Sequence, residues 1–152
     1  MNSFSSDDGT RLQELLEEET DIFRQIRELT RVQKELLAAD DIDGFNSALD
    51  DRLELIEKIN GLHQETNLLM QSYKVFKNSP GGSESVEIEN AVALLQETIA
   101  ETVELDGSNA VLAKRKAEEY IKQIGKLSLT RKSIGKYAPG APTTSALFDR
   151  KT

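Results

Sequence analysis

Residues 12–36 read LQELLEEETDIFRQIRELTRVQKEL, and their apolar side chains recur with helical spacing. One row repeats every seven residues and consists of Leu15, Ile22, Leu29 and Leu36. A companion row contains two polar members and consists of Leu12, Glu19, Ile26 and Gln33. Such a repeat is typical of a helix that packs lengthwise against other helices. We therefore predict a helix over about residues 9–39, capped at its start by Asp7 or Asp8.

A short acidic link, residues 40–44, separates this helix from a second one. So short a link forces the two helices into an antiparallel hairpin. The second helix again has a seven-residue repeat, formed by Leu55, Leu62, Leu69 and Phe76, and a neighbouring row formed by Leu49, Ile56, His63 and Met70. We predict that it spans about residues 43–77 and that Asp41 or Asp43 caps it.

The segment Asn78–Ser83 contains a proline and two adjacent glycines, and it predicts a second turn. Beyond it, apolar residues again recur with helical spacing. Residues 106–109, Asp-Gly-Ser-Asn, are weak helix formers that suit a turn or a kink. However, the seven-residue register that joins Ile99 to Ala113 runs through them unbroken. This register favours one long third helix over about residues 86–135.

Together these patterns predict an all-α fold of three long antiparallel helices that form an elongated bundle or coiled coil. The third helix is the longest, so its C-terminal part extends beyond the other two. Residues 1–137 are expected to form a single helical-bundle domain, which suits a chain of 152 residues. Residues 138–152 lack periodicity and are rich in Pro, Ala and Thr with one Gly, so they are expected to be a mobile Pro/Gly-rich tail.

The composition and its distribution exclude several classes of protein. The chain has no cysteine, hence no disulfide framework and no cysteine-based zinc site. The polar, acidic residues 1–10 do not resemble a signal peptide, and no apolar stretch approaches the roughly 18 residues of a membrane span. A cytoplasmic location is therefore expected.

Charge is distributed unevenly along the chain. Residues 1–110 contain 9 Lys and Arg against 24 Asp and Glu, whereas residues 111–137 contain 8 against 2. The net charge of -8 disfavours nucleic acid as a partner, because a polyanion is repelled at long range. The basic segment either meets an acidic partner or complements the helix dipole and the acidic helices beside it.

No pattern indicates catalysis, a cofactor or a metal, so the chain is not expected to be an enzyme. A carboxylate-bridged di-metal bundle needs Glu-x-x-His on two helices, but Asn60 stands three residues before His63, the one histidine. We interpret His63 as a partly buried core or rim residue. The pair Gly81-Gly82 is not followed by Lys-Ser or Lys-Thr, so it is not a phosphate-binding loop of the Walker type.

The third helix carries a second apolar row, formed by Leu94, Leu105 and Leu112 and lying away from the main one. Two interpretations fit this row. Exposed leucines at this spacing bind another helix, whereas a helix that touches two neighbours needs a wide apolar arc. The part that extends past its neighbours also carries Tyr120, Ile124 and Leu127. Apolar side chains on an unpaired stretch of helix indicate that another segment or a partner covers them.

Four sequence patterns are shared with a known family, and they are Gln33-Lys34-Glu35-Leu36-Leu37, Leu49-x-x-x-Leu53-Glu54-Leu55-Ile56-x-x-Ile59, Leu105-x-x-x-Asn109-x-x-Leu112, and Gly135-Lys136-Tyr137 before Pro139-Gly140. On these patterns the chain resembles the FlgN-type flagellar export chaperones over nearly its whole length. The patterns are combinations of residue types and contain no signature of chemical groups.

The resemblance implies an elongated helical coiled coil that holds hook-associated proteins in the cytoplasm before secretion. It implies that the clients' terminal helices bind the C-terminal part of the third helix, for which the candidate residues are Leu105, Asn109, Leu112, Arg115, Lys116, Tyr120, Ile124 and Leu127. It also implies the membrane export gate as a second partner, and the heptads are compatible with a homodimer.

The alternative is a coiled-coil scaffold or oligomerisation module without a role in secretion. A scaffold forms a permanent oligomer through its heptads, whereas a chaperone keeps an open groove and gains stability from its client.

Overall fold

The computed structural model describes residues 4–133, and for residues 128–133 only the backbone is considered. Its three helices are α1 (Ser6–Ala38), α2 (Ile42–Lys77) and α3 (Val86–Ser133). The predicted all-α fold, with the third helix longest, is confirmed. The end of the predicted third helix, residues 134–135, and the predicted tail, residues 138–152, lie outside the described residues. The domain boundary at residue 137 stays a prediction.

The starts of α1 and α2 are set by side-chain caps. Ser5 caps α1, so the prediction of Asp7 or Asp8 in that role was wrong. Ser5 Oγ accepts from the backbone N–H of Asp8 at 3.1 Å, and Asp8 Oδ2 accepts from the N–H of Ser5 at 3.0 Å, which is a capping box. At α2 the predicted cap Asp41 is confirmed, since its Oδ1 accepts from the N–H of Gly44 at 2.9 Å.

Two tight turns reverse the chain between the helices. Asp40 has a φ of 58°, in the left-handed region that short polar residues tolerate, and it ends α1. The N–H of Asp41 then donates to the carbonyl of Leu36 at 2.9 Å and closes the turn. The second turn, in the predicted Pro-Gly-Gly segment, contains Gly81 with a φ of 80°. We call the turn at residues 39–41 the hairpin tip.

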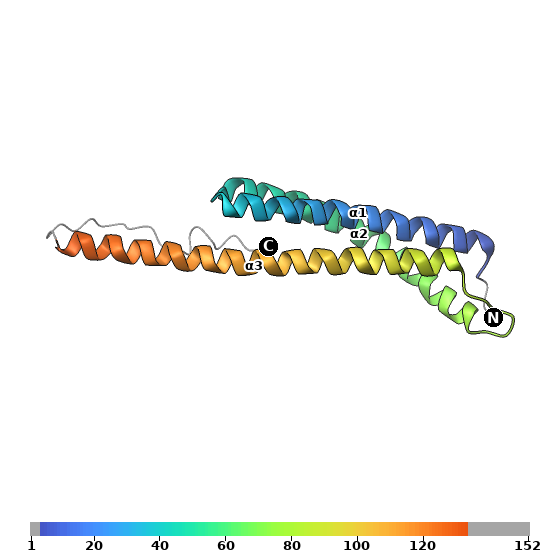
Figure 1. Cartoon of the computed structure of the whole chain (residues 1–152). Coiled ribbons are helices and arrows are strands. Elements are labelled where there is room, and N and C mark those ends of the chain that lie inside the picture. Colours follow the sequence, from blue (N-terminus) through green and yellow to red (C-terminus); the bar gives the residue numbers. More distant parts are fainter. Residues whose placement is uncertain (1–3, 134–152) are drawn as a thin grey trace.

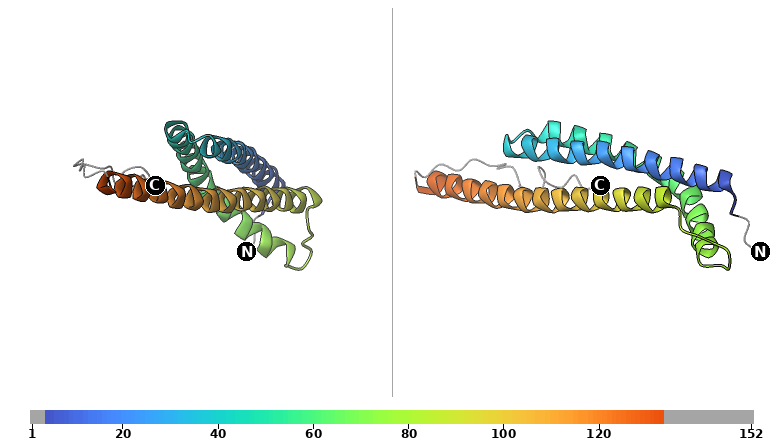
Figure 2. Two further views of the ribbon diagram at one scale, coloured as in Figure 1. Left: turned by 60° about the vertical axis from the view of Figure 1, so that its left-hand side comes forward. Right: turned by 45° about the vertical axis from the view of Figure 1, so that its right-hand side comes forward.

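The chain runs up, down and up, so α1 and α3 are parallel to each other and antiparallel to α2 (Figure 1). α1 packs along both other helices, whereas α2 and α3 approach each other closely at few points. α2 crosses α3 obliquely, so its two ends lie on opposite sides of α3 (Figure 2). α3 runs well past the hairpin tip, as its predicted length requires (Figure 1). The molecule is therefore an open assembly around α1.

The apolar core is divided into two clusters. The proximal cluster joins all three helices and consists of Leu12, Leu16, Tyr73 and Ile88, with Phe4 and others packed around them. The middle cluster joins α1 and α2 only and consists of Ile22, Ile26, Leu55 and Ile59. α3 therefore shares an apolar core with the hairpin near its own N-terminus and contributes no member to the middle cluster.

A hydrogen-bonded group reinforces the proximal cluster. Tyr73 Oη donates to Glu89 Oε2 at 2.7 Å and accepts from the N–H of Ser85 at 2.9 Å. Burial raises the pKa of the Tyr73 phenol, and the hydrogen bond from Tyr73 lowers the pKa of Glu89. This group ties the end of α2 to the start of α3.

The predicted apolar row that contains His63 lies at the edge of the core. The His63 side chain is 63% exposed, and its Nδ1 lies 3.4 Å from Oε1 of Glu19, whose side chain is buried. His63 is thus a rim residue, and Glu19 is the buried polar member that interrupts the companion row of α1.

Candidate binding surface on the third helix

The first part of the predicted surface lies against the hairpin. Asn109 is buried, and Leu105 and Leu112 are half-buried. Leu94, the remaining member of the second apolar row, is 43% exposed. For Leu105 and Leu112 the structure therefore agrees with the wide-arc interpretation, and the three leucines do not form one continuous exposed row.

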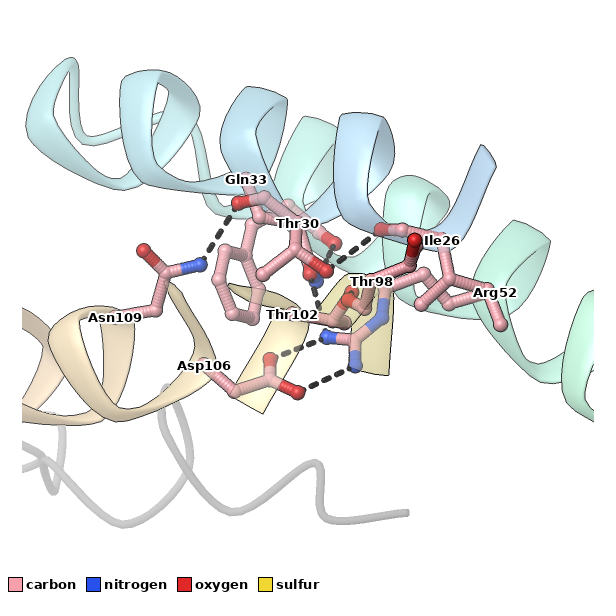
Figure 3. A network of polar contacts seen from close by, with 9 residues as sticks. Ile26, Thr30, Gln33, Arg52, Thr98, Thr102, Asp106 and Asn109 are labelled. Atoms are coloured by element: carbon pink, nitrogen blue, oxygen red, sulfur yellow. Dashed lines mark hydrogen bonds and ion pairs between the residues drawn. The ribbon is translucent and has the colours of Figure 1, made fainter. Parts of the chain in front are cut away.

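Asn109 connects α3 directly to α1 (Figure 3). Its Nδ2 donates to the backbone carbonyl of Thr30 at 2.9 Å, and only 6% of the residue is exposed. Its Oδ1 is buried and has no hydrogen-bond partner among the described residues. In this conformation Asn109 holds two helices together and offers nothing to an outside partner.

An ion pair between α2 and α3 lies next to Asn109 (Figure 3). The Arg52 guanidinium donates to both carboxylate oxygens of Asp106 at 2.8 Å, and it also donates to Oε1 of Gln33 on α1 at 2.8 Å. The Arg52 side chain is 13% exposed and the Asp106 side chain is 43% exposed, so the guanidinium is shielded from water whereas the carboxylate is partly open to it. Two-point geometry of this kind is the strong form of a charge-assisted hydrogen bond.

The pair explains why weak helix formers occur in a long helix. Asp106 reaches α2 and Asn109 reaches α1 from this stretch of α3, and the predicted continuity of the helix through them is confirmed. The sequence analysis missed Arg52 as a partner. The available signals were the polar Gln33 in an apolar row of α1 and the apolar register that Asp106 shares with Ile99 and Ala113.

The second part of the predicted surface lies at the hairpin tip. Lys116 Nζ lies 3.1 Å from Asp40 Oδ1 and 3.4 Å from the carbonyl of Ala38, at the end of α1. A pocket of about 340 Å³ opens beside this contact and is lined by Leu37, Asp40, Ile42, Lys116, Glu119, Tyr120 and Gln123. The structure thus brings Lys116 and Tyr120 together with the hairpin tip.

The third part lies on the overhang, which we define as residues 121–133 of α3. Ile124 is half-buried, whereas Ile121 is 53% and Leu127 is 54% exposed. Lys122 and Lys126 are exposed beside them. Arg115, the remaining predicted residue, is exposed on α3 and immediately precedes Lys116, which contacts the hairpin tip. The overhang therefore combines apolar and basic side chains on one helix.

The described residues, 4–133, contain neither a cluster of metal-ligating side chains nor a membrane-spanning helix. No group of three or more His, Cys, Asp or Glu side chains among them is placed to hold a metal ion. None of the helices in this range has a stretch long and apolar enough to span a bilayer.

An open assembly of helices, with one long helix that presents apolar and basic side chains beyond its neighbours, defines the class as an elongated all-α protein. The model of the FlgN protein family matches residues 4–134, and the chain belongs to this family of flagellar export chaperones. The predicted resemblance is thereby confirmed. No curated protein and no solved structure matches the chain.

Proposed function

We propose that this chain binds the terminal amphipathic helix of hook-associated proteins in the cytoplasm and shields it until export. Membership of the family supports a role in flagellar export. The observation that carries the choice of site is the overhang, where Ile121 and Leu127 are more than half exposed on a helix without a neighbouring helix of the hairpin (Figure 1). Side chains of this kind on an isolated helix are suited to cover another apolar face.

The chemistry of the surface fits an amphipathic helix as its client. A helix of this type places apolar side chains on one face, and each buried Leu contributes about 1.5–3 kcal/mol before the costs of association. Lys122, Lys126 and Arg115 are exposed near that apolar surface and complement acidic residues on the flanks of a client helix. The pocket at the hairpin tip is large enough to accept a client side chain at the end of the surface.

A binding titration with a matched pair of variants tests the proposal. Leu127→Asp places a charge on the overhang, and we expect the affinity for a purified hook-associated protein to fall at least about ten-fold in isothermal titration calorimetry. Leu68→Asp is the control, because Leu68 is 59% exposed on α2, away from the overhang. Its affinity should stay unchanged, and both variants should keep the helicity of the parent. Equal affinity of all three proteins would overturn the proposed site.

We also propose the membrane export gate as a second partner, because a chaperone must deliver its client.

The scaffold alternative makes a different prediction about assembly. Sedimentation of the chain alone and with the client distinguishes the two, since a scaffold stays a permanent oligomer and a chaperone forms a new complex.

A further inference from the structure

We propose that α3 is held against the hairpin by a releasable seam, and that opening of this seam regulates the binding surface. We define the seam as Thr30 on α1, Thr98, Thr102 and Asn109 on α3, and the Arg52–Asp106 pair (Figure 3). The inference rests on the proposed function, because the face that the seam covers includes Leu105, Asn109 and Leu112 of the predicted surface.

The buried threonines of the seam are satisfied within their own helices. Thr30 Oγ1 donates to the carbonyl of Ile26 at 2.7 Å. Thr98 and Thr102 donate in the same way to the carbonyls of Leu94 and Thr98, each at 2.8 Å. These bonds survive separation of the helices, so opening the seam breaks no hydrogen bond of the three threonine hydroxyls. The threonine side chains that it exposes are small and bury far less apolar surface than Leu or Ile.

The bonds that do cross the seam leave buried polar atoms without partners. Arg52 Nε and Asn109 Oδ1 are both buried and lack a hydrogen-bond partner among the described residues. A buried unpaired donor or acceptor destabilises the closed arrangement, because water satisfies the same atom once the seam opens. The Arg52–Asp106 pair and the Asn109–Thr30 bond are the polar contacts of the seam itself. The Arg27–Glu101 and Lys116–Asp40 pairs also join this part of α3 to α1 and the hairpin tip.

The structure on either side of the seam defines what moves. The hairpin keeps its own apolar core, the middle cluster, to which α3 contributes nothing. The start of α3 is fixed by the proximal cluster through Ile88 and by the Glu89–Tyr73 hydrogen bond. Opening is therefore a movement of α3 away from α1 about its N-terminal end, with the hairpin intact.

An opened seam offers its face to a client helix, which competes with α1 for it. The apparent affinity for a client is the intrinsic affinity multiplied by the fraction of open molecules. Variants that weaken the closed arrangement therefore bind the client more tightly, and a covalent bridge across the seam prevents binding to this face.

Hydrogen exchange of the full chain, without any client, tests the seam by itself. In Asp106→Asn we expect the amides of residues 98–116 to exchange at least about ten-fold faster, because this stretch of α3 loses the packing that keeps its own backbone hydrogen bonds closed, while those of residues 86–92 and 55–62 stay unchanged. The control is Glu65→Gln, which weakens a more exposed two-point pair with Arg11 between α1 and α2. This variant should leave the exchange rates of the amides in residues 98–116 unchanged. Unchanged exchange in Asp106→Asn, or equal acceleration along the whole chain, would overturn the seam.

A covalent tether across the seam tests whether opening of the seam controls binding of the client. Arg27 and Glu101 are partly exposed and paired across α1 and α3 at 2.9 Å, and the chain has no cysteine of its own. Arg27→Cys with Glu101→Cys, bridged by a short thiol cross-linker, should bind a synthetic peptide of a client's terminal helix at least about ten-fold more weakly than the same variant with capped thiols. Asp106→Asn should bind the peptide several-fold more tightly.

The two experiments separate failure of the seam from failure of the proposed function. Equal affinity of the tethered and capped forms would overturn regulation by the seam and leave the proposed function standing. Absence of peptide binding in every form would overturn the proposed function, and the exchange result would still decide whether the seam opens.

Discussion

At the scale of single residues, the polar side chains inside the molecule differ in what they do. Thr98 and Thr102 are buried and bonded to their own helix, so they fill space without linking neighbours. Tyr73 and Asn109 are also buried, but their hydrogen bonds join different helices. The first kind therefore leaves the helices free to separate, and the second kind joins one helix to another.

The Tyr73–Glu89 pair predicts a loss of stability at both extremes of pH. The pKa of Glu89 lies below its ordinary value of 4.5, so its contribution is complete above pH 4.5 and disappears as the pH falls through the lowered pKa. The pKa of Tyr73 lies above its ordinary value of 10.0, so its contribution is complete below pH 10.0 and disappears as the pH rises through the raised pKa.

Tyr73→Phe tests this pair by urea unfolding at several pH values. The variant should lose about 1–2 kcal/mol at pH 7, because the bonds to Glu89 and Ser85 are removed. Its remaining stability should fall less steeply than that of the parent above pH 10.0, since no phenol ionises at this site. A parallel fall in both proteins would show that another group causes the alkaline loss.

At the scale of elements, α3 keeps a glycine in its interior that the fold does not need. A Cβ at Gly107 would meet no atom within 4 Å, and the residue has helical backbone. Gly107→Ala should therefore raise the free energy of unfolding by about 0.5–1 kcal/mol, measured by thermal denaturation. Gly82→Ala is the counterpart, because its Cβ would lie 1.8 Å from the carbonyl oxygen of Phe76, and it should destabilise the second turn. Destabilisation by Gly107→Ala would argue against a continuous helix.

The elements were predictable from the sequence because their apolar repeats are local. The seven-residue register identified all three helices, and it correctly placed residues 106–109 inside α3. The start of α1 was misplaced because three residues, Ser5, Asp7 and Asp8, suit a cap about equally, and the reciprocal bond between Ser5 and Asp8 selects among them.

The predicted surface was harder to read from the sequence, because its exposure depends on where α1 lies. Leu105 and Leu112 have the same spacing whether they face water or a neighbouring helix. The Arg52–Asp106 pair joins residues far apart in the chain, and no local pattern distinguishes Arg52 from the solvated arginines of α1.

At the scale of the whole molecule, the hairpin is acidic and the C-terminal part of α3 is basic. The Lys116–Asp40 contact is one point where the two regions meet. The Arg27–Glu101 and Arg52–Asp106 pairs also join α3 to the hairpin and favour the closed seam. Salt weakens such ion pairs because the Debye length is about 10 Å at 0.1 M and shorter above it.

We therefore expect exchange of the amides in residues 98–116 to accelerate a few-fold between about 0.05 M and 0.5 M NaCl. Hydrogen exchange at the two salt concentrations, with residues 86–92 as the internal reference, checks this expectation. Asp106→Asn should respond less to salt than the parent, because one of the charges that close the seam is already gone. Slower exchange at high salt would contradict an electrostatic contribution to closure.

Because α3 is long, a small rotation at its N-terminal end produces a large displacement of its C-terminal end. The helix has 48 residues, and at about 1.5 Å per residue the part from Ile88 to Ser133 measures roughly 67 Å. With its fulcrum in the proximal cluster, this rod acts as a lever arm. A rotation of about 10° at the fulcrum sweeps the far end through roughly 12 Å, about the diameter of a helix with its side chains. Loss of the Arg52–Asp106 pair near the middle of α3 thereby displaces the overhang, and a client bound to it, by the width of a helix.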